Sequence, residues 1–233
     1  MVRPSEKVCN NCHKTVAVKQ AYEKAFDRWA SNGEFDGVAG RLDSLYKVLE
    51  PYAFAYDYYN ETVRTIEVSN FAMSIARLYG RDGSFDADKA KELAKPFFKD
   101  YYMPIDKECF VALMKEFGKM IPADLQPKFY KEQLQKYGNV ESWADSLFAN
   151  SVFADEAKME SLGENYHDIL IHDPASIYYI EMQNWALPHL NKARALNRDL
   201  QLLYRTYMRG QMDFAPDRTV YYPDANLTLR VSY

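Results

Sequence analysis

The chain has 233 residues, of which 48% are hydrophobic and 27% are charged, which is ordinary for a globular chain with a substantial core. Its net charge of −4 gives no indication of binding to nucleic acid or to an anionic membrane surface. No apolar run approaches the roughly 20 residues of a membrane-spanning helix, and no signal peptide is recognisable at the N-terminus. The 19 tyrosines and 9 glycines favour long packed helices, or else a tyrosine-lined peptide cleft.

The N-terminal segment, residues 1–13, is polar and lacks helical periodicity, so we expect it to be irregular. It contains the pattern Cys9-x-x-Cys12-His13, which is the attachment signature of c-type haem. Two other interpretations stay open: thiols that are free or joined in a local disulfide, and a metal site completed by Cys109 or another histidine. A zinc site usually needs four ligands at recognisable spacing. We therefore expect no metal and no cofactor.

The first part of the chain has apolar residues at helical spacing in three segments. The spacing predicts a helix over 15–30 and a short helix over 42–49. Pro51 suits the first turn of a helix, because its missing N–H would be unbonded there. From that proline the apolar pattern continues without interruption and covers two faces, so we predict one long central helix over 51–79.

Shorter helical segments follow, separated by proline and glycine signals. In chain order they cover residues 86–100, 104–120, 129–137, 142–148 and 151–162. The last helix is predicted over 173–210, with Asp173 as its N-cap, Pro174 in its first turn and Pro188 bending it midway. Its outer side is basic, which indicates a solvated face or a contact with an acidic surface outside this chain. The basic residues are Arg194, Arg198, Arg205 and Arg209.

The C-terminal segment, residues 219–233, differs from the rest because apolar and polar residues alternate in it. This period is typical of a strand with one apolar face. The apolar positions are Leu227, Leu229, Val231 and Tyr233. A lone strand leaves its backbone N–H and C=O groups unpaired and is not stable by itself. We therefore expect this segment to enter a sheet that lies outside the 233 residues.

Residues 222–233, which read Tyr-Pro-Asp-Ala-Asn-Leu-Thr-Leu-Arg-Val-Ser-Tyr, resemble a segment of the S46 family of bacterial dipeptidyl-peptidases. Residues 97–101, 105–110, 150–156 and 173–175 also resemble parts of this family, in the same order along the chain. The resemblance implies a serine exopeptidase that removes dipeptides from peptide N-termini. It also implies a chymotrypsin-like double β-barrel with a large helical domain inserted into it. This chain would be most of that helical insert, and its last residues would return to the barrels.

The resemblance implies a catalytic serine triad, but none of the three residues matches a position in this sequence, so the triad would belong to the barrels. The four histidines, His13, His167, His172 and His189, lack a context that indicates catalysis. We expect each of them to be structural or exposed. The resemblance also implies a protein without haem, which favours a chain without a cofactor. No catalytic residue is therefore predicted here.

Three polar residues of the C-terminal segment are the candidate site residues: Asp224, Asn226 and Arg230. One interpretation is structural, with Asp224 and Asn226 bonding turn amides and Arg230 pairing across a sheet. The other interpretation places them at the border of the substrate cleft in the longer enzyme. The residues themselves leave both interpretations open.

We predict an all-α fold of roughly ten helices with a C-terminal strand segment. The expected divisions are an irregular segment over 1–13, a helical cap domain over 14–213 and a strand segment over 214–233 that returns to a catalytic domain. The cap would limit access to free N-termini, so this chain alone should not hydrolyse peptides. The alternatives are a free-standing helical interaction module and a c-type haem protein.

The resemblance also implies partners and a location for the longer protein. The partners of this chain would be the catalytic β-barrel domain and peptide substrates, with no nucleic acid and no membrane span. The longer protein would be a homodimer and would reside in the periplasm or at the cell surface.

Overall fold

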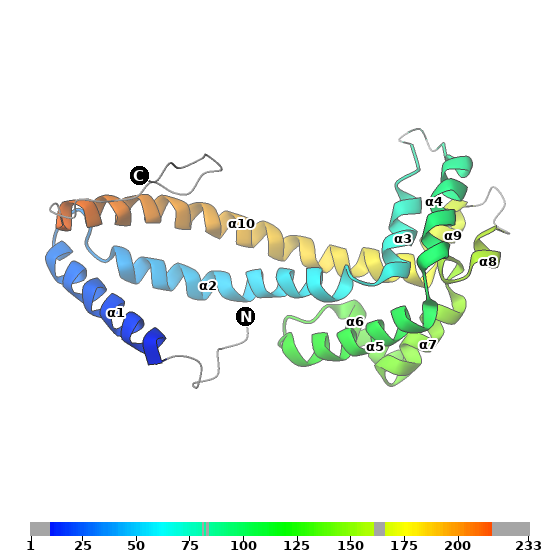
Figure 1. Cartoon of the computed structure of the whole chain (residues 1–233), viewed down its shortest axis with the longest axis horizontal. Helices are drawn as coiled ribbons and strands as arrows, with labels where there is room; N and C mark the ends of the chain where they lie inside the picture. Colours follow the sequence, from blue (N-terminus) through cyan, green and yellow to red (C-terminus); the bar gives the residue numbers. More distant parts are fainter. Residues whose placement is uncertain (1–9, 81, 83, 161–165, 216–233) are drawn as a thin grey trace, which may run out of the picture. The chain divides into compact units, whose positions relative to one another are not determined.

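The computed structural model describes residues 10–80, 82, 84–160 and 166–215 (Figure 1). Within these residues the chain forms ten α-helices, one π-helical turn and one 3₁₀ turn, and its only β feature is a single bridge between Tyr79 and Phe85. The predicted all-α fold class is therefore confirmed. The predicted strand at the C-terminus falls on residues 216–233, which lie outside the described part. No described helix combines the length and the apolar character that crossing a membrane requires.

The chain divides into two compact units, and we describe each by itself. Unit 1 comprises residues 1–50 and 194–233, and unit 2 comprises residues 51–193. The helices are α1 (Asn10–Ala30), α2 (Val38–Tyr58), α3 (Glu67–Ala76), α4 (Ala87–Asp100), α5 (Met103–Met120), α6 (Lys128–Tyr137), α7 (Val140–Asn150), α8 (Glu156–Glu160), α9 (Tyr166–His172) and α10 (Pro174–Phe214). The turns are η1 (Tyr59–Val63) and η2 (Val152–Ala154). Helices α2 and α10 contribute residues to both units.

In unit 1, aromatic side chains join α1 to the end of α10. Phe26 is fully buried, and its ring centroid lies 5.1 Å from that of Tyr207 and 5.8 Å from that of Phe214. Trp29 stacks on Phe35, which follows α1, with ring centroids 5.9 Å apart. Edge-to-face and stacked ring pairs add stability beyond the area that they bury. This cluster is the core of unit 1.

Gly210 in α10 allows the rings of this cluster to approach the helix backbone. A Cβ atom at this position would lie 2.9 Å from Phe26 and 3.0 Å from Phe35, which is too close for carbon atoms. Gly40 in α2 is a contrasting case, because a Cβ atom there would meet nothing within 4 Å. The glycine in α10 is therefore required by packing, whereas the glycine in α2 is not.

In unit 2, the main core lies where α5 and α7 meet the first part of α10. The ring of Phe110 on α5 lies 5.0 Å from the ring of Trp143 on α7 and 5.1 Å from the ring of Tyr178 on α10. Two turns further along α5 and α10, the rings of Phe117 and Trp185 lie 5.3 Å apart. Large aromatic side chains from three helices therefore interlock in one buried cluster, as the high tyrosine and phenylalanine content indicated.

A second aromatic group holds α4 against α3. Phe71 on α3 stacks on Phe97 with ring centroids 4.0 Å apart, and its edge contacts Phe98 at 5.6 Å. On its other side Phe71 meets Phe153 of η2 at 6.0 Å. Helix α4 and turn η2 are thus both fixed to α3, which determines how α4 and the following helix α8 are placed.

The prediction of one continuous helix over 51–79 was wrong. Helix α2 ends at Tyr58, η1 follows, and a new helix α3 begins after Ile66, whose backbone is extended with ψ of 114°. The carboxylate of Asp106 on α5 accepts hydrogen bonds from the backbone N–H groups of Glu67 and Val68, both at 2.9 Å. These bonds satisfy amides at the start of α3, so the helix begins there. The cap comes from a distant helix, so the local pattern could not reveal it.

The position of Pro51 was also predicted wrongly. This proline does not begin a helix, because the predicted short helix over 42–49 continues through it as α2. Helix α1 begins at Asn10, within the segment that was predicted to be irregular, and α9 was not predicted at all. The segments predicted over 86–100, 104–120 and the two that follow correspond to α4, α5, α6 and α7.

The predicted helix over 151–162 was wrong in its first residues. Ser151 is extended, and its hydroxyl donates a hydrogen bond to the carboxylate of Asp173 at 3.0 Å. The N–H of Val152 donates to the same carboxylate at 2.8 Å. Asp173 also accepts from Ala175 N–H at 2.8 Å, which confirms its predicted role as the N-cap of α10. One buried carboxylate therefore joins η2 to the start of α10.

We expect Gly210→Ala to lower the free energy of unfolding by about 1–3 kcal/mol, because Phe26 and Phe35 must move away from the new methyl group. Gly40→Ala is the matched control, since it adds the same methyl group to a helix without a clash. It should raise the stability by about 0.5–1 kcal/mol. Thermal and urea unfolding of both variants tests this, and a stabilising Gly210→Ala would contradict the packing of unit 1.

Asp106→Ala leaves the N–H groups of Glu67 and Val68 without their acceptor in a buried site. We expect a loss of about 2–4 kcal/mol in the free energy of unfolding, measured with urea. The control is Asp86→Ala, because Asp86 caps the exposed start of α4 by accepting from Lys89 N–H at 2.9 Å. That change should cost only about 1 kcal/mol. Equal losses in the two variants would refute the role of burial.

Candidate functional site

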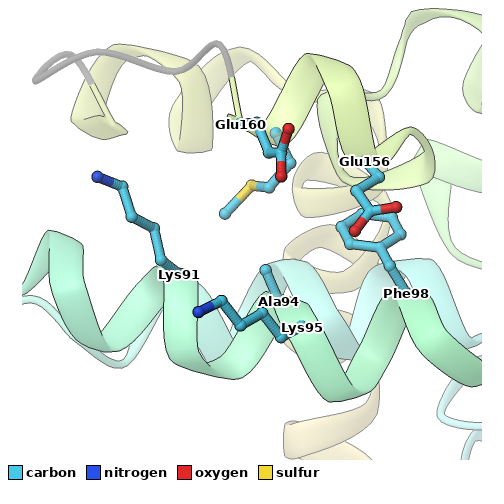
Figure 2. Close-up of a pocket in the computed structure, with 7 residues that line it drawn as sticks. Lys91, Ala94, Lys95, Phe98, Glu156 and Glu160 are labelled. Atoms are coloured by element: carbon cyan, nitrogen blue, oxygen red, sulfur yellow. The ribbon is translucent and has the colours of Figure 1, made fainter.

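A surface groove lies between α4 and α8 and has a cavity volume of about 260 Å³ (Figure 2). Its floor is apolar and consists of Ala94 and Phe98 from α4 and Met159 from α8. Met159 is buried, so it anchors the short helix α8 in unit 2. We call this feature the α4–α8 groove. All of its residues belong to unit 2.

The rim of the α4–α8 groove carries two cations and two anions. Lys91 and Lys95 stand one turn apart on α4, and Glu156 and Glu160 stand one turn apart on α8. All four residues are exposed. In the part of the chain that the structure describes, no ion pair within 4.0 Å joins either lysine to either glutamate. The groove thus presents separated charges of both signs above an apolar floor.

Two local features place the walls of the groove. Helix α4 is fixed at its start by the Asp86 cap and along its length by the stack of Phe97 on Phe71. Helix α8 begins after Asp155, whose carboxylate accepts from Lys158 N–H at 3.2 Å. Helix caps and ring packing therefore hold the two helices that carry the charged side chains opposite each other.

A second surface lies on unit 1, where α10 runs beside the first half of α2. Two shallow grooves meet there at Leu202, which is 61% exposed. Further residues that line them are Arg41, Val48, Arg194, Arg198 and Arg205. We call this set, with Leu202, the α10 basic surface. The predicted basic side of the last helix is therefore present and exposed, and it is combined with apolar side chains.

The described histidines contact nearby oxygen atoms, and two of them also meet tyrosine rings. His167 lies 5.9 Å from Tyr79 and His189 lies 6.0 Å from Tyr52, measured between ring centroids. His172 and His189 each approach a backbone oxygen four residues earlier, at 2.7 and 2.8 Å. The Nδ1 atom of His167 lies 3.6 Å from an oxygen of the neighbouring Asp168, and both side chains are exposed. The side chain of His13 is not described, so the expectation that all four histidines are structural or exposed stays a prediction.

The predicted site residues Asp224, Asn226 and Arg230 lie outside the described residues, as does Cys9. Cys12 and His13 belong to α1, but the structure does not describe their side chains. The cleft-border and haem interpretations therefore stay predictions. Among the residues that are described, no group of three or more His, Cys, Asp or Glu side chains is arranged to hold a metal ion. The Cys109 thiol is free and exposed on α5.

Sequence reasoning missed the α4–α8 groove. A signal was present, because Lys91/Lys95 and Glu156/Glu160 are like-charged pairs at a spacing of four, which destabilise an isolated helix. The signal is weak in α4, because Asp88 and Glu92 stand three residues before Lys91 and Lys95 and offset their repulsion. The two pairs could not be placed opposite each other from the sequence, since α8 was predicted within the wrong helix over 151–162.

Two buried carboxylates, Asp106 and Asp173, are also candidates for chemistry, because shifted pKa values gather at functional sites. Burial raises the pKa of both, and this outweighs the opposing effect of the hydrogen bonds that they accept. Their oxygens accept from backbone amides and from the hydroxyls of Tyr101 and Ser151. These contacts identify the two carboxylates as caps that fix helix ends.

In its described residues the chain is all-α, and its surface carries grooves lined by charged side chains. The family model of Peptidase S46 matches residues 7–233. The chain therefore belongs to the peptidase S46 family, which confirms the resemblance seen in its sequence.

Two similar proteins that are named dipeptidyl-peptidases support this family membership. Dipeptidyl-peptidase 7 of Phocaeicola vulgatus is 25% identical over 238 residues, which cover 96% of this chain and 32% of the relative. The Asp/Glu-specific dipeptidyl-peptidase of Porphyromonas gingivalis is 30% identical over 137 residues, which cover 58% of this chain and 19% of the relative. The chain thus spans about a third or less of the length of these relatives.

Solved structures show the same fold. The crystal structure of Porphyromonas endodontalis DPP11 matches with a TM-score of 0.70 and 20% identity, covering 85% of this chain and 30% of the other. The complex of that protein with the dipeptide Arg-Asp matches with a TM-score of 0.72 and 22% identity, covering 91% of this chain and 32% of the other. At this level of identity the likeness establishes the fold.

The raised pKa of Asp106 predicts a specific pH dependence. The folded state holds the proton more tightly than the unfolded state, so this group stabilises the fold fully below its unfolded pKa of about 3.9. The contribution is lost as the pH rises through the raised folded pKa. Asp106→Asn cannot titrate, so the stability of the wild type relative to this variant should decrease as the pH rises above the unfolded pKa of about 3.9.

Urea unfolding of both proteins at several pH values measures this difference. A wild-type advantage that grows as the pH rises would contradict the expected sign for Asp106.

Proposed function

We propose that this chain is the helical part of a longer serine dipeptidyl-peptidase and acts as a cap over its catalytic site. The observation that carries this proposal is the family match over residues 7–233, in a chain that spans only 32% of a relative named dipeptidyl-peptidase. The longer enzyme would release dipeptides from the N-termini of peptides. Its nucleophile, base and orienting carboxylate would come from a β-barrel domain outside these residues.

The cap would act through access and closure. A helical domain that closes over a cleft excludes water from the reacting groups and admits only a chain end. This mode of action requires a surface that meets the catalytic domain. The α10 basic surface supports the proposal, because it exposes Leu202 and Val48 beside three arginines of α10. An acidic patch with apolar residues on the catalytic domain would complement it.

The proposal extends to the setting of the longer protein. We propose that it is a homodimer of the periplasm or the cell surface. Asp224, Asn226 and Arg230 would then lie where the chain re-enters the barrels, close to the substrate cleft. The free-standing interaction module is the second candidate, and the same α10 basic surface favours it, because an exposed mixed surface of this kind also suits a separate partner.

The purified 233-residue chain should release no dipeptide from chromogenic dipeptidyl substrates, because the proposed nucleophile lies elsewhere. The product of the longer reading frame should cleave them, and a serine-directed inhibitor should stop it. Inhibitor-sensitive cleavage by the shorter chain would contradict the division of roles. A reading frame without a β-barrel domain would favour the interaction module.

Charge reversal tests the surface within the longer enzyme. Arg194→Glu combined with Arg198→Glu should lower kcat/KM about tenfold, because like charges would then meet at the interface. Lys128→Glu combined with Lys131→Glu is the control, since both lysines are exposed on α6 of unit 2. Equal effects of the two double variants would refute a specific role of the α10 basic surface.

A further inference from the structure

The charges of the α4–α8 groove lie on separate walls. Figure 2 shows Glu156 beside the ring of Phe98, whereas the ammonium groups of Lys91 and Lys95 lie toward the opposite end. Glu160 extends over the groove from α8. The groove therefore has an anionic wall and a cationic wall, with apolar atoms between them.

Each wall holds two like charges one helical turn apart. Such pairs repel each other within their own helix. Across the groove the walls attract each other, but no ion pair joins them in the described residues. Both pairs of charges are therefore available to interact with a bound ligand. A bound group of opposite sign would relieve the repulsion on either wall.

The ligand can be deduced from these charges. A simple anion would be attracted to Lys91 and Lys95 but repelled by the two glutamates, and a simple cation would experience the reverse. A molecule with a carboxylate at one end and an ammonium at the other satisfies both walls. The apolar floor of Phe98, Ala94 and Met159 requires an apolar part between or beside these ends.

We infer that the α4–α8 groove binds a short peptide with two free ends, its carboxylate at Lys91 and Lys95 and its ammonium at Glu156 and Glu160. The cavity of about 260 Å³ lies just below the usual range for small-molecule sites, which limits the ligand to a very short peptide. An apolar side chain of the peptide packs on Phe98 and Met159. This inference concerns binding alone and does not depend on the proposed cap or on peptide cleavage.

Met159 provides a reporter inside the groove. We would label the methionine methyl groups of the full chain with carbon-13 and titrate it with the dipeptide Ala-Phe while recording methyl spectra. The Met159 signal should shift and saturate at millimolar peptide, because the few exposed contacts give only weak binding. Methionines outside the groove, such as Met73 on α3, should not shift.

The capped peptide N-acetyl-Ala-Phe-amide is the matched ligand control, since it keeps both side chains and loses both charges. It should shift Met159 at least about ten times less at equal concentration. Equal shifts from the free and capped peptides would show an apolar groove without charge recognition and would overturn the inference. No saturable shift of Met159 with Ala-Phe would overturn it as well.

Variants separate the two walls. Lys91→Ala combined with Lys95→Ala, and Glu156→Gln combined with Glu160→Gln, should each weaken binding about tenfold or more. Lys99→Ala changes an exposed lysine of α4 outside the groove and should leave the affinity unchanged. Thermal unfolding confirms that each variant is folded. Wild-type affinity in both double variants would overturn the inference, and this result is independent of whether the longer enzyme cleaves peptides.

Discussion

Two buried carboxylates that accept backbone N–H hydrogen bonds determine where α3 and α10 begin. Asp106 on α5 caps α3, and Asp173 caps α10 while it also binds the N–H of Val152. Each bond links segments that are far apart in the sequence, so the helix ends and the tertiary packing are fixed together. The desolvation of these carboxylates opposes folding, but leaving the same amides unpaired would cost more. Asp173 thereby joins η2 to α10, and the contact of Phe153 with Phe71 then joins η2 to α3.

The aromatic core of unit 2 fixes the positions of the helices that form the α4–α8 groove. Phe71 contacts both Phe97 and Phe153, so one side chain relates α4 to η2, the turn that precedes α8. Side chains in a close-packed interior have little room to move, so the position of one element fixes that of its neighbour. The lysines of α4 and the glutamates of α8 consequently face one another because of contacts made beneath them. The arrangement of charges along the α4–α8 groove therefore depends on the core contacts as well as on the charged residues themselves.

Local features of the sequence were sufficient for the fold class and for most helices. The helical spacing of apolar residues located α4 to α7, and Asp173 followed by Pro174 located the start of α10. The errors at 51–79 and 151–162 share one cause, because in both places a distant aspartate accepts backbone N–H hydrogen bonds and fixes a local conformation that the apolar pattern does not show. The α4–α8 groove was missed for a similar reason, since two like-charged pairs reveal their relation only once the packing is known. Family membership came from residues 222–233 and from weaker matches along the chain, a different kind of information from periodicity.

Helix α8 has only five residues, and this has a consequence for the acidic wall of the groove. A helix of this length is unstable in isolation, because nucleation is not repaid by so few backbone bonds. Its order depends on the buried Met159 and on the Asp155 cap. Local opening of such an element requires less free energy than global unfolding. Any molecule that bridges α8 to α4 would therefore slow the exchange of the α8 amides with solvent, so that occupancy and local order would rise together.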